Sequence, residues 1–296
     1  MICSVRFLKI VHHGVYVLPV ILLNVLGALA QSDSGWVLPK IQTSPSVTVF
    51  NLIKTDLDSS IHDGVSFVTA PAHFGWKEWT VAALCIGATG SLVFADTSMK
   101  SFAQSHRTAN RDQLILPWEY YGSGYTGVAI GAAAYCGGLG FSSPWWRETG
   151  REVLTALAIS GAAGEILKIG FGRMRPYTGQ GPRTLNPFSL QDSSSSFPSG
   201  HTMTAFVVSS VLAERIDNPF ISCGFYAMAL LTGAERIYSN NHWLSDAFFG
   251  AILGTVIGRS VGHKEEDVIH GGGKLTWEID PDISLPGIGL TLKADF

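Results

Sequence analysis

The sequence predicts an all-α protein: a six-helix bundle preceded by a signal segment and followed by a small β-hairpin. Six apolar segments of helical length alternate with breaks that contain Gly, Pro or Asn. Hydrophobic residues make up 46% of the chain and charged residues only 15%, which favours a large helical core or a membrane protein. The six predicted helices cover residues 77–95, 125–140, 151–170, 201–216, 220–238 and 242–262.

Residues 1–30 are predicted to be a signal peptide. Arg6 and Lys9 precede an apolar run over residues 15–30, which ends in Ala-Leu-Ala, a sequence that suits signal peptidase. Cleavage there would make Gln31 the first residue of an exported protein that is associated with the cell envelope or faces the periplasm. An uncleaved membrane anchor is the alternative, although the run is short for a full span and contains Pro and Asn.

Residues 31–76 are predicted to form an N-terminal extension with one amphipathic helix. The stretch up to about Pro45 is polar, and apolar residues then recur at helical spacing over 47–61. These residues are Val49, Phe50, Ile53, Leu57 and Ile61. An apolar stripe of this kind usually faces a protein core, so we expect the helix to pack on the main domain through it.

The predicted helical domain spans residues 77–262 and is expected to associate with a membrane. Between Tyr120 and Trp146 the chain carries no charge over a length sufficient to cross a bilayer, which needs ~20 residues. Aromatic residues at both ends of this stretch match the interface belts of membrane proteins. The Gly and Ala content of the segments allows close helix approach, which fits a membrane bundle or a tightly packed soluble one.

Residues 263–296 form a tail of a different kind. Three glycines after His270 predict a flexible joint, and apolar and polar residues then alternate over 275–279 and 288–292. Two strands joined through residues 281–287 are therefore expected to form a hairpin that lies on the domain.

The composition excludes several classes of function. The net charge is −3, so the chain has no basic surface of the kind that binds nucleic acid. Its 4 cysteines are isolated and lack the spacing of a zinc site. No carboxylate cluster suited to a metal ion is evident in the sequence, and no metal or other cofactor is expected.

Three clusters of charged and polar residues lie at the ends of predicted helices. In the first, Lys168 and Arg175 stand two helical turns apart near the end of 151–170. Such cations can hold phosphate oxygens, arginine as a fork and lysine as a point charge. The alternative is a set of solvated cations that includes Arg173, with Glu165 forming an i, i+3 bridge to Lys168.

The second cluster is Pro198-Ser199-Gly200-His201, a turn directly before a predicted helix. Backbone N–H groups at a helix N-terminus bind anions, and Gly200 allows close approach of such a ligand. His201 could donate a proton to a leaving oxygen. Ser199 could instead be only the helix cap, and His201 only a partly exposed polar residue. The serine run 193–196 before this turn is assigned no catalytic role.

The third cluster joins the last two predicted helices and contains Arg236, His242 and Asp246. Because His242 and Asp246 are four residues apart, they share a helix face if the helix begins at His242. A carboxylate beside an imidazole fixes its tautomer, and the oriented nitrogen becomes a competent nucleophile. An exposed polar pair is the alternative, but apolar residues surround this one in the sequence.

Together the three clusters resemble the signature of the type 2 phosphatidic acid phosphatase superfamily, which includes bacterial acid phosphatases and vanadium haloperoxidases. That signature is K-x6-R-P, P-S-G-H and S-R-x5-H-x3-D. The chain reads Lys168-x6-Arg175-Pro176, Pro198-Ser199-Gly200-His201 and Glu235-Arg236-x5-His242-x3-Asp246. The resemblance covers about residues 77–262. Its one departure is Glu235, where the family usually has Ser; the change could alter hydrogen bonding near a phosphate, and Glu235 itself is given no role.

The resemblance implies a metal-independent phosphatase that hydrolyses a phosphomonoester or pyrophosphate of a small molecule or a lipid. By that resemblance His242 attacks phosphorus and forms a phosphohistidine, Asp246 orients His242, and His201 protonates the leaving group. The residues implied to hold the phosphoryl group are Lys168, Arg175 and Arg236, assisted by Ser199 and Gly200. The physical logic agrees, because phosphoryl transfer requires charge neutralisation and in-line positioning above all.

Two other functions remain open. A vanadate-dependent haloperoxidase would hold vanadate with the same cations and His242, and the motif does not separate this chemistry from that of a phosphatase. A phosphate-binding membrane protein without turnover would need only the cations, although the intact His201, His242 and Asp246 argue against it. The sequence does not name the substrate, the oligomeric state or the side of the membrane that the site faces.

Overall fold

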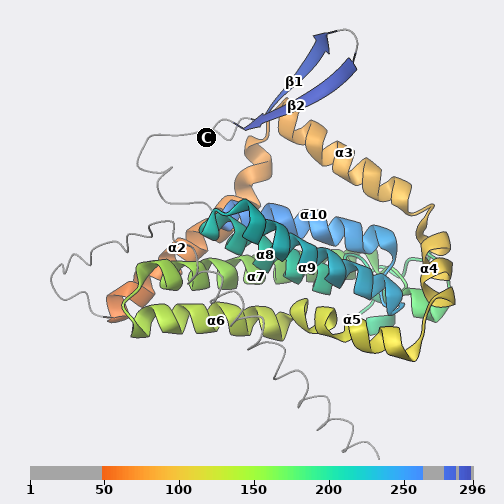
Figure 1. Cartoon of the computed structure of the whole chain (residues 1–296), viewed down its shortest axis with the longest axis horizontal. Helices are drawn as coiled ribbons and strands as arrows, with labels where there is room; N and C mark the ends of the chain where they lie inside the picture. Colours follow the sequence, from red (N-terminus) through yellow and green to blue (C-terminus); the bar gives the residue numbers. More distant parts are fainter. Residues whose placement is uncertain (1–48, 263–276, 285–286, 295–296) are drawn as a thin grey trace, which may run out of the picture. The chain divides into compact units, whose positions relative to one another are not determined.

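The chain is described here by a computed structural model that covers residues 49–262, 277–284 and 287–294. These residues form nine α-helices, three short 3-10 helices and two strands (Figure 1). The α-helices are α2 (Val49–Thr69), α3 (Trp76–Leu92), α4 (Asp96–Ser105), α5 (Ala109–Tyr121), α6 (Gly124–Gly140), α7 (Pro144–Phe171), α8 (Gly200–Ile216), α9 (Pro219–Tyr238) and α10 (Leu244–Val261). The 3-10 helices are η1 (Ala70–His73), η2 (Pro176–Thr178) and η3 (Asp192–Ser194). The predicted signal peptide, residues 1–30, lies outside the described residues.

Each of the six predicted helices overlaps a helix of the structure, but the count of six is wrong. The corresponding helices are α3, α6, α7, α8, α9 and α10. Helices α4 and α5 occupy a stretch for which the sequence predicted none. α4 is short and mostly polar, and α5 contains Pro117 and has little helical periodicity, so neither gave a clear apolar pattern.

Helix α2 packs on α7 through its polar side, which is the reverse of the expected arrangement. Asp56 is buried and lies 3.4 Å from Arg147 Nε, and Asp63 accepts a hydrogen bond of 2.8 Å from Arg151. All five apolar residues of the predicted stripe are exposed, Phe50 by 71%. Ion pairs and hydrogen bonds therefore attach α2 to the bundle, and its apolar stripe faces away from the described helices.

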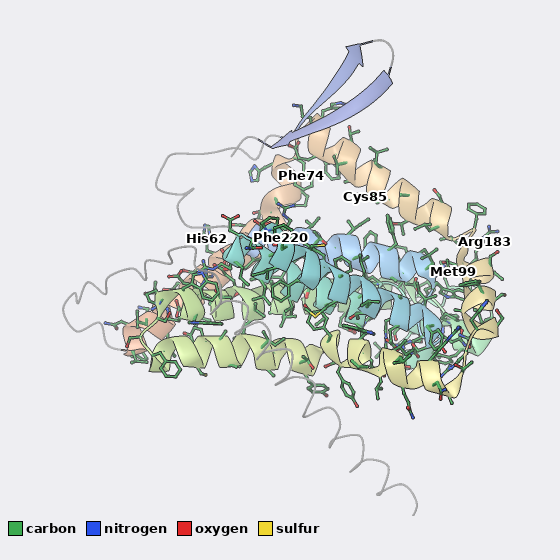
Figure 2. The ribbon with its side chains drawn as sticks, viewed as in Figure 1. His62, Phe74, Cys85, Met99, Arg183 and Phe220 are labelled. Carbon is green, nitrogen blue, oxygen red and sulfur yellow. The ribbon has the colours of Figure 1, made fainter. Side chains whose placement is uncertain are left out.

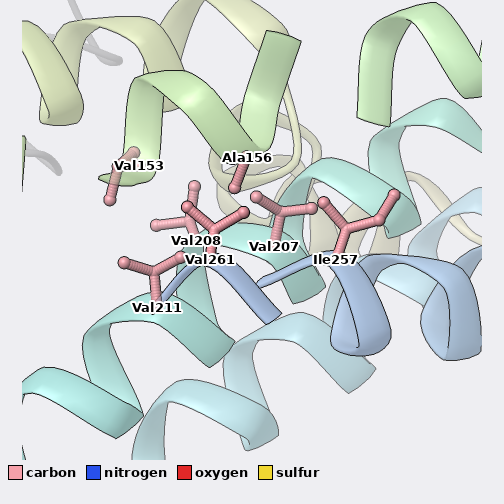
Figure 3. Close-up of a cluster of buried hydrophobic side chains, with 7 residues drawn as sticks. All are labelled: Val153, Ala156, Val207, Val208, Val211, Ile257 and Val261. Atoms are coloured by element: carbon pink, nitrogen blue, oxygen red, sulfur yellow. The ribbon is translucent and has the colours of Figure 1, made fainter. Parts of the chain in front are cut away.

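The apolar core of the bundle lies where α7, α8 and α10 meet (Figure 3). Seven buried side chains form it: Val153 and Ala156 from α7, Val207, Val208 and Val211 from α8, and Ile257 and Val261 from α10. These side chains are short or β-branched, which lets the three helices approach closely while filling the space between them.

Helices α8 and α10 approach so closely that their contact requires glycine. A Cβ atom at Gly254 would lie 2.5 Å from Met203 O, and one at Gly258 would lie 2.8 Å from Val207 O. The two glycines are one helical turn apart, as small residues are in closely packed membrane helices. This contact keeps the N-terminal ends of α8 and α10 together, which is where two of the three sequence clusters lie.

The lengths and composition of the helices indicate that the protein associates with a membrane. Helices α7 and α10 are long and apolar enough to cross one, and α3 with α4 would add a span if this pair, bent by 54°, counts as one. The uncharged stretch Tyr120–Trp146 is not a single helix, because it is divided among α5, α6 and α7. Large apolar side chains are exposed on the surface, among them Phe74 before α3 and Phe220 in α9 (Figure 2).

Residues 263–296 form a second compact unit. Within it β1 (Trp277–Ser284) and β2 (Gly287–Ala294) pair antiparallel, with Trp277 opposite Ala294 and Ser284 opposite Gly287. Both strands are longer than the alternating stretches 275–279 and 288–292 on which the sequence prediction rested.

We predict that Gly254→Ala lowers the free energy of unfolding by about 1–3 kcal/mol, because the added methyl group would overlap Met203 O and push α8 from α10. Gly161→Ala is the matched control, since a Cβ atom there meets nothing within 4 Å. It is expected to be neutral or slightly stabilising. Thermal unfolding of both full-length variants in one detergent measures the difference, and equal stability would contradict the close approach of the two helices.

Candidate active site

The structure brings the three sequence clusters to one end of the bundle. This is the end where α7 and α9 finish and where α8 and α10 begin. A Cβ atom at Gly200 would lie 3.3 Å from Lys168 Nζ, so the first and second clusters are neighbours. The Ser199 N–H donates to Asp246 O at 3.1 Å, which joins the second cluster to the third.

His242 lies in the loop before α10, not on the helix itself. Its Nδ1 is 2.7 Å from the Ser196 carbonyl oxygen, so Nδ1–H donates to this carbonyl and Nε2 keeps its lone pair. The distance from Nδ1 to Asp246 Oδ2 is 3.9 Å, too long for a hydrogen bond. The two side chains are close, as the spacing predicted, but His242 lies outside the helix and a backbone carbonyl rather than Asp246 accepts the Nδ1 proton.

Asp246 is fully buried and holds the backbone on both sides of His242. Its Oδ2 accepts hydrogen bonds from Ser196 Oγ at 2.5 Å and from the Trp243 N–H at 2.9 Å. Ser196 in turn offers its carbonyl to His242. Asp246 therefore orients His242 through an intermediate residue, and the serine run contributes a positioning group that the sequence did not predict.

Arg173 is a buried ion-pair partner, although the sequence had suggested a solvated cation. Its Nη2 lies 2.7 Å from Asp96 Oδ2, and its Nη1 pairs with Asp246 and donates to Ser245 Oγ at 2.8 Å. Sequence reasoning missed both Arg173 and Asp96. The signal was present, because Asp96 directly follows the charge-free residues 79–95, and a charge in such a place needs a partner.

Lys168 and Arg175 line a polar cavity of about 290 Å³ at this end of the bundle. Lys168 Nζ lies 2.6 Å from Glu165 Oε1, and Arg175 Nη2 lies 2.8 Å from Asp192 Oδ1 and 3.0 Å from Ser195 Oγ. The two carboxylates are 64% and 74% exposed, respectively. Ion pairs this exposed are weak, so an anionic ligand can replace the carboxylates.

Arg236 is buried and has two carboxylate neighbours. Its Nε pairs with Glu235, and its Nη2 lies 3.0 Å from Glu119 Oε1. At that distance Nη2 still lacks a well-directed hydrogen bond, as does the buried Nε of Arg175, within the part of the chain that the structure describes. Buried N–H donors without an acceptor favour the binding of an anion.

Ser199 and Gly200 differ in what they can offer a ligand. The Ser199 hydroxyl lies 2.9 Å from Thr202 Oγ1, and its N–H is used by Asp246, so both groups point into the protein. Gly200 begins α8 and leaves room for Lys168 beside the helix N-terminus, whose first N–H groups have no partner within the helix. Gly200 is therefore suited to anion binding. Ser199 instead uses its hydroxyl and N–H groups in hydrogen bonds within the protein.

Burial lowers the pKa of the His201 imidazole to about 4, and the positive charges of Arg236, Arg175 and Lys168 act in the same direction. Only the Glu119 carboxylate raises this pKa among the main neighbours. The free site therefore holds His201 neutral at pH 7.

Burial also holds the pKa of His242 well below its usual range, and Arg175 and Arg236 add to this effect. The hydrogen bond to Ser196 opposes it. A neutral imidazole with a free Nε2 is the form that can attack phosphorus. In the described part of the chain, no three His, Cys, Asp or Glu side chains are grouped as metal ligands would be.

Residues 150–266 match the family model of the PAP2 superfamily, and they contain all three clusters. This part of the chain is therefore similar to the PAP2 superfamily. It is similar to a lipid A 1-phosphatase of Porphyromonas gingivalis, with 33% identity over 132 residues, 44% of this chain and 26% of the relative. It is also similar to a lipid A 1-phosphatase of Rhizobium etli, with 32% identity over 110 residues, 36% of this chain and 45% of the relative. The chain thus spans less than half the length of either relative.

Among solved structures, the chain shares the fold of a transmembrane PAP2-type phosphatidylglycerolphosphate phosphatase from Bacillus subtilis. The TM-score is 0.53 at 18% sequence identity, and the match covers 67% of this chain and 99% of the other. This likeness concerns the helical fold.

We predict that the His201 and His242 rings stay neutral as the pH falls from 8 to 5. Because each pKa lies below the usual 6.5, protonation is postponed to lower pH. NMR of histidine-labelled protein in micelles, with His201→Asn and His242→Asn used for assignment, measures both titrations. A midpoint near 6.5 for either ring would contradict the burial and positive field described above.

Proposed function

We propose that this protein is a phosphatase that hydrolyses the phosphate ester or anhydride of a lipid. One arrangement carries the proposal: Nε2 of His242 keeps its lone pair and lies among cations of which two, Arg175 and Arg236, have buried N–H groups that lack a well-directed hydrogen bond among the described residues. A phosphoryl group satisfies those donors and places phosphorus within reach of a nucleophile. The lipid A 1-phosphatase activity of the two relatives supports the same reaction class.

In the proposed reaction the lone pair of His242 Nε2 forms a bond to phosphorus while the bond to the leaving oxygen breaks. The leaving alkoxide takes a proton from His201. A water molecule then attacks the phosphohistidine, His201 accepts a proton from this water, and inorganic phosphate and neutral His242 are released. Asp246 takes no part in proton transfer and acts by holding Ser196 and Trp243 around His242.

The substrate itself supplies the condition under which His201 can act as an acid. In the free site three cations lower its pKa. A phosphate dianion bound to Lys168, Arg175 and Arg236 neutralises much of that field and adds negative charge beside the imidazole, which raises the pKa. The proton needed by the leaving group is thus held on His201 only when a phosphate is bound.

A lipid is the proposed substrate because an apolar cavity adjoins the site. The cavity has a volume of about 700 Å³ and is lined by Met99, Phe102, Leu114, Ile237, Tyr238 and Leu244 among others. Tyr238 and Leu244 stand at either end of the loop that carries His242. A hydrocarbon chain in this cavity would keep its phosphate at the cations while most of the substrate stays out of water.

We predict that the purified protein releases phosphate from lipid phosphates in excess chelator, and that His242→Ala lowers kcat by at least about 10³-fold, since the attacking nitrogen is lost. His62→Ala is the matched control, because His62 is an exposed histidine of α2. Phosphate release in detergent is the measurement. No activity on any lipid phosphate, or full activity in His242→Ala, would overturn the proposal.

We further propose that residues 1–30 are a signal peptide and that the site faces the periplasm or the cell envelope. The basic residues before the apolar run support this. A single cysteine at the exposed Gln191, introduced after the native cysteines are replaced, is expected to react with a membrane-impermeant thiol reagent in intact cells. Labelling only after lysis would place the site on the cytoplasmic side.

A further inference from the structure

Glu235 is a buried carboxylate inside the candidate site, at the one position where the motif departs from the usual Ser. Its exposed fraction is 3%, and its Oε2 accepts a hydrogen bond from Arg236 Nε. Glu235 and Arg236 are consecutive residues near the end of α9. Their contact therefore does not depend on how α9 packs against other helices.

Arg236 has a second carboxylate neighbour, and the two differ sharply in their exposure to water. The Glu119 side chain is 43% exposed, whereas that of Glu235 is 3% exposed. Water and salt screen a charge at the first position much more than at the second. The negative charge of Glu235 therefore acts on Arg236 with less screening than that of Glu119, which is also the carboxylate that raises the pKa of His201.

The contact made by Glu235 also determines which N–H groups of Arg236 remain available to bind a ligand. Glu235 takes the Nε–H, while Nη2 remains buried without a well-directed hydrogen bond among the described residues. A guanidinium whose Nε is held by a fixed carboxylate cannot rotate freely, so its outer donors keep one direction.

We propose that Glu235 is a positioning residue and fixed counter-charge for Arg236. It holds the guanidinium so that its outer N–H groups face the phosphate, and its charge weakens the hold of the three cations on released inorganic phosphate. This inference rests on the proposed phosphatase function. It assigns to the Ser-to-Glu change a role in product release, because a site with three uncompensated cations would retain a phosphate dianion strongly.

The test compares Glu235→Gln, Glu235→Ala and the matched control Glu119→Gln in the full-length protein. Glu235→Gln keeps an acceptor for Arg236 Nε but removes the charge, so inhibition by inorganic phosphate should strengthen at least tenfold, with a single-turnover rate within threefold of wild type. Glu235→Ala also removes the acceptor, so its single-turnover rate should fall at least tenfold. Glu119→Gln removes a more exposed charge from the same guanidinium, so it should strengthen phosphate inhibition less than Glu235→Gln does.

Unchanged or weaker phosphate inhibition in Glu235→Gln would overturn the counter-charge role. Equal single-turnover rates in Glu235→Gln and Glu235→Ala would overturn the positioning role. Calorimetric binding of inorganic phosphate to Glu235→Gln tests the counter-charge role without turnover, and also serves if Glu235→Ala does not fold. A wild-type protein that neither hydrolyses a lipid phosphate nor binds inorganic phosphate would instead show that the proposed function fails.

Discussion

The candidate site depends on one buried arginine that holds two carboxylates from distant parts of the chain. Arg173 follows α7, Asp96 begins α4 and Asp246 lies in the first turn of α10, and the guanidinium pairs with both acids. Without Arg173 two buried carboxylates would lose their cation, and breaking a buried ion pair in this way costs about 3–5 kcal/mol. The pairs thereby fix the starts of α4 and α10 beside the loop that follows α7.

A series of hydrogen bonds connects Arg173 to His242, the proposed nucleophile. Asp246, held by Arg173, receives the Ser196 hydroxyl, and the Ser196 carbonyl receives the proton on His242 Nδ1. The carboxylate therefore acts one residue away from the imidazole. This separation leaves Nε2 available for chemistry, and the buried surroundings keep the ring neutral.

The candidate phosphate-binding cations are balanced by carboxylates, but not in the same way. Lys168 and Arg175 pair with exposed acids that water screens, whereas Arg236 has the buried Glu235 as well as the half-exposed Glu119. The first two cations can release their acids to an incoming phosphate. Arg236 instead contacts a carboxylate that is as buried as its own guanidinium, and the counter-charge role proposed for Glu235 rests on this contact.

The sequence by itself determined the helical class, the six apolar helices α3 and α6 to α10, and the residues gathered at one end of the bundle. Apolar runs and ordered motif spacing are local properties, so they can be read along the chain. Only the tertiary structure decided that Arg173 is buried, that the Ser196 carbonyl rather than Asp246 accepts the Nδ1 proton of His242, and that α2 turns its polar side inward. The physical reason is that burial and ion-pair choice depend on groups brought together from distant segments: Arg173 lies 77 residues from Asp96 and 73 from Asp246.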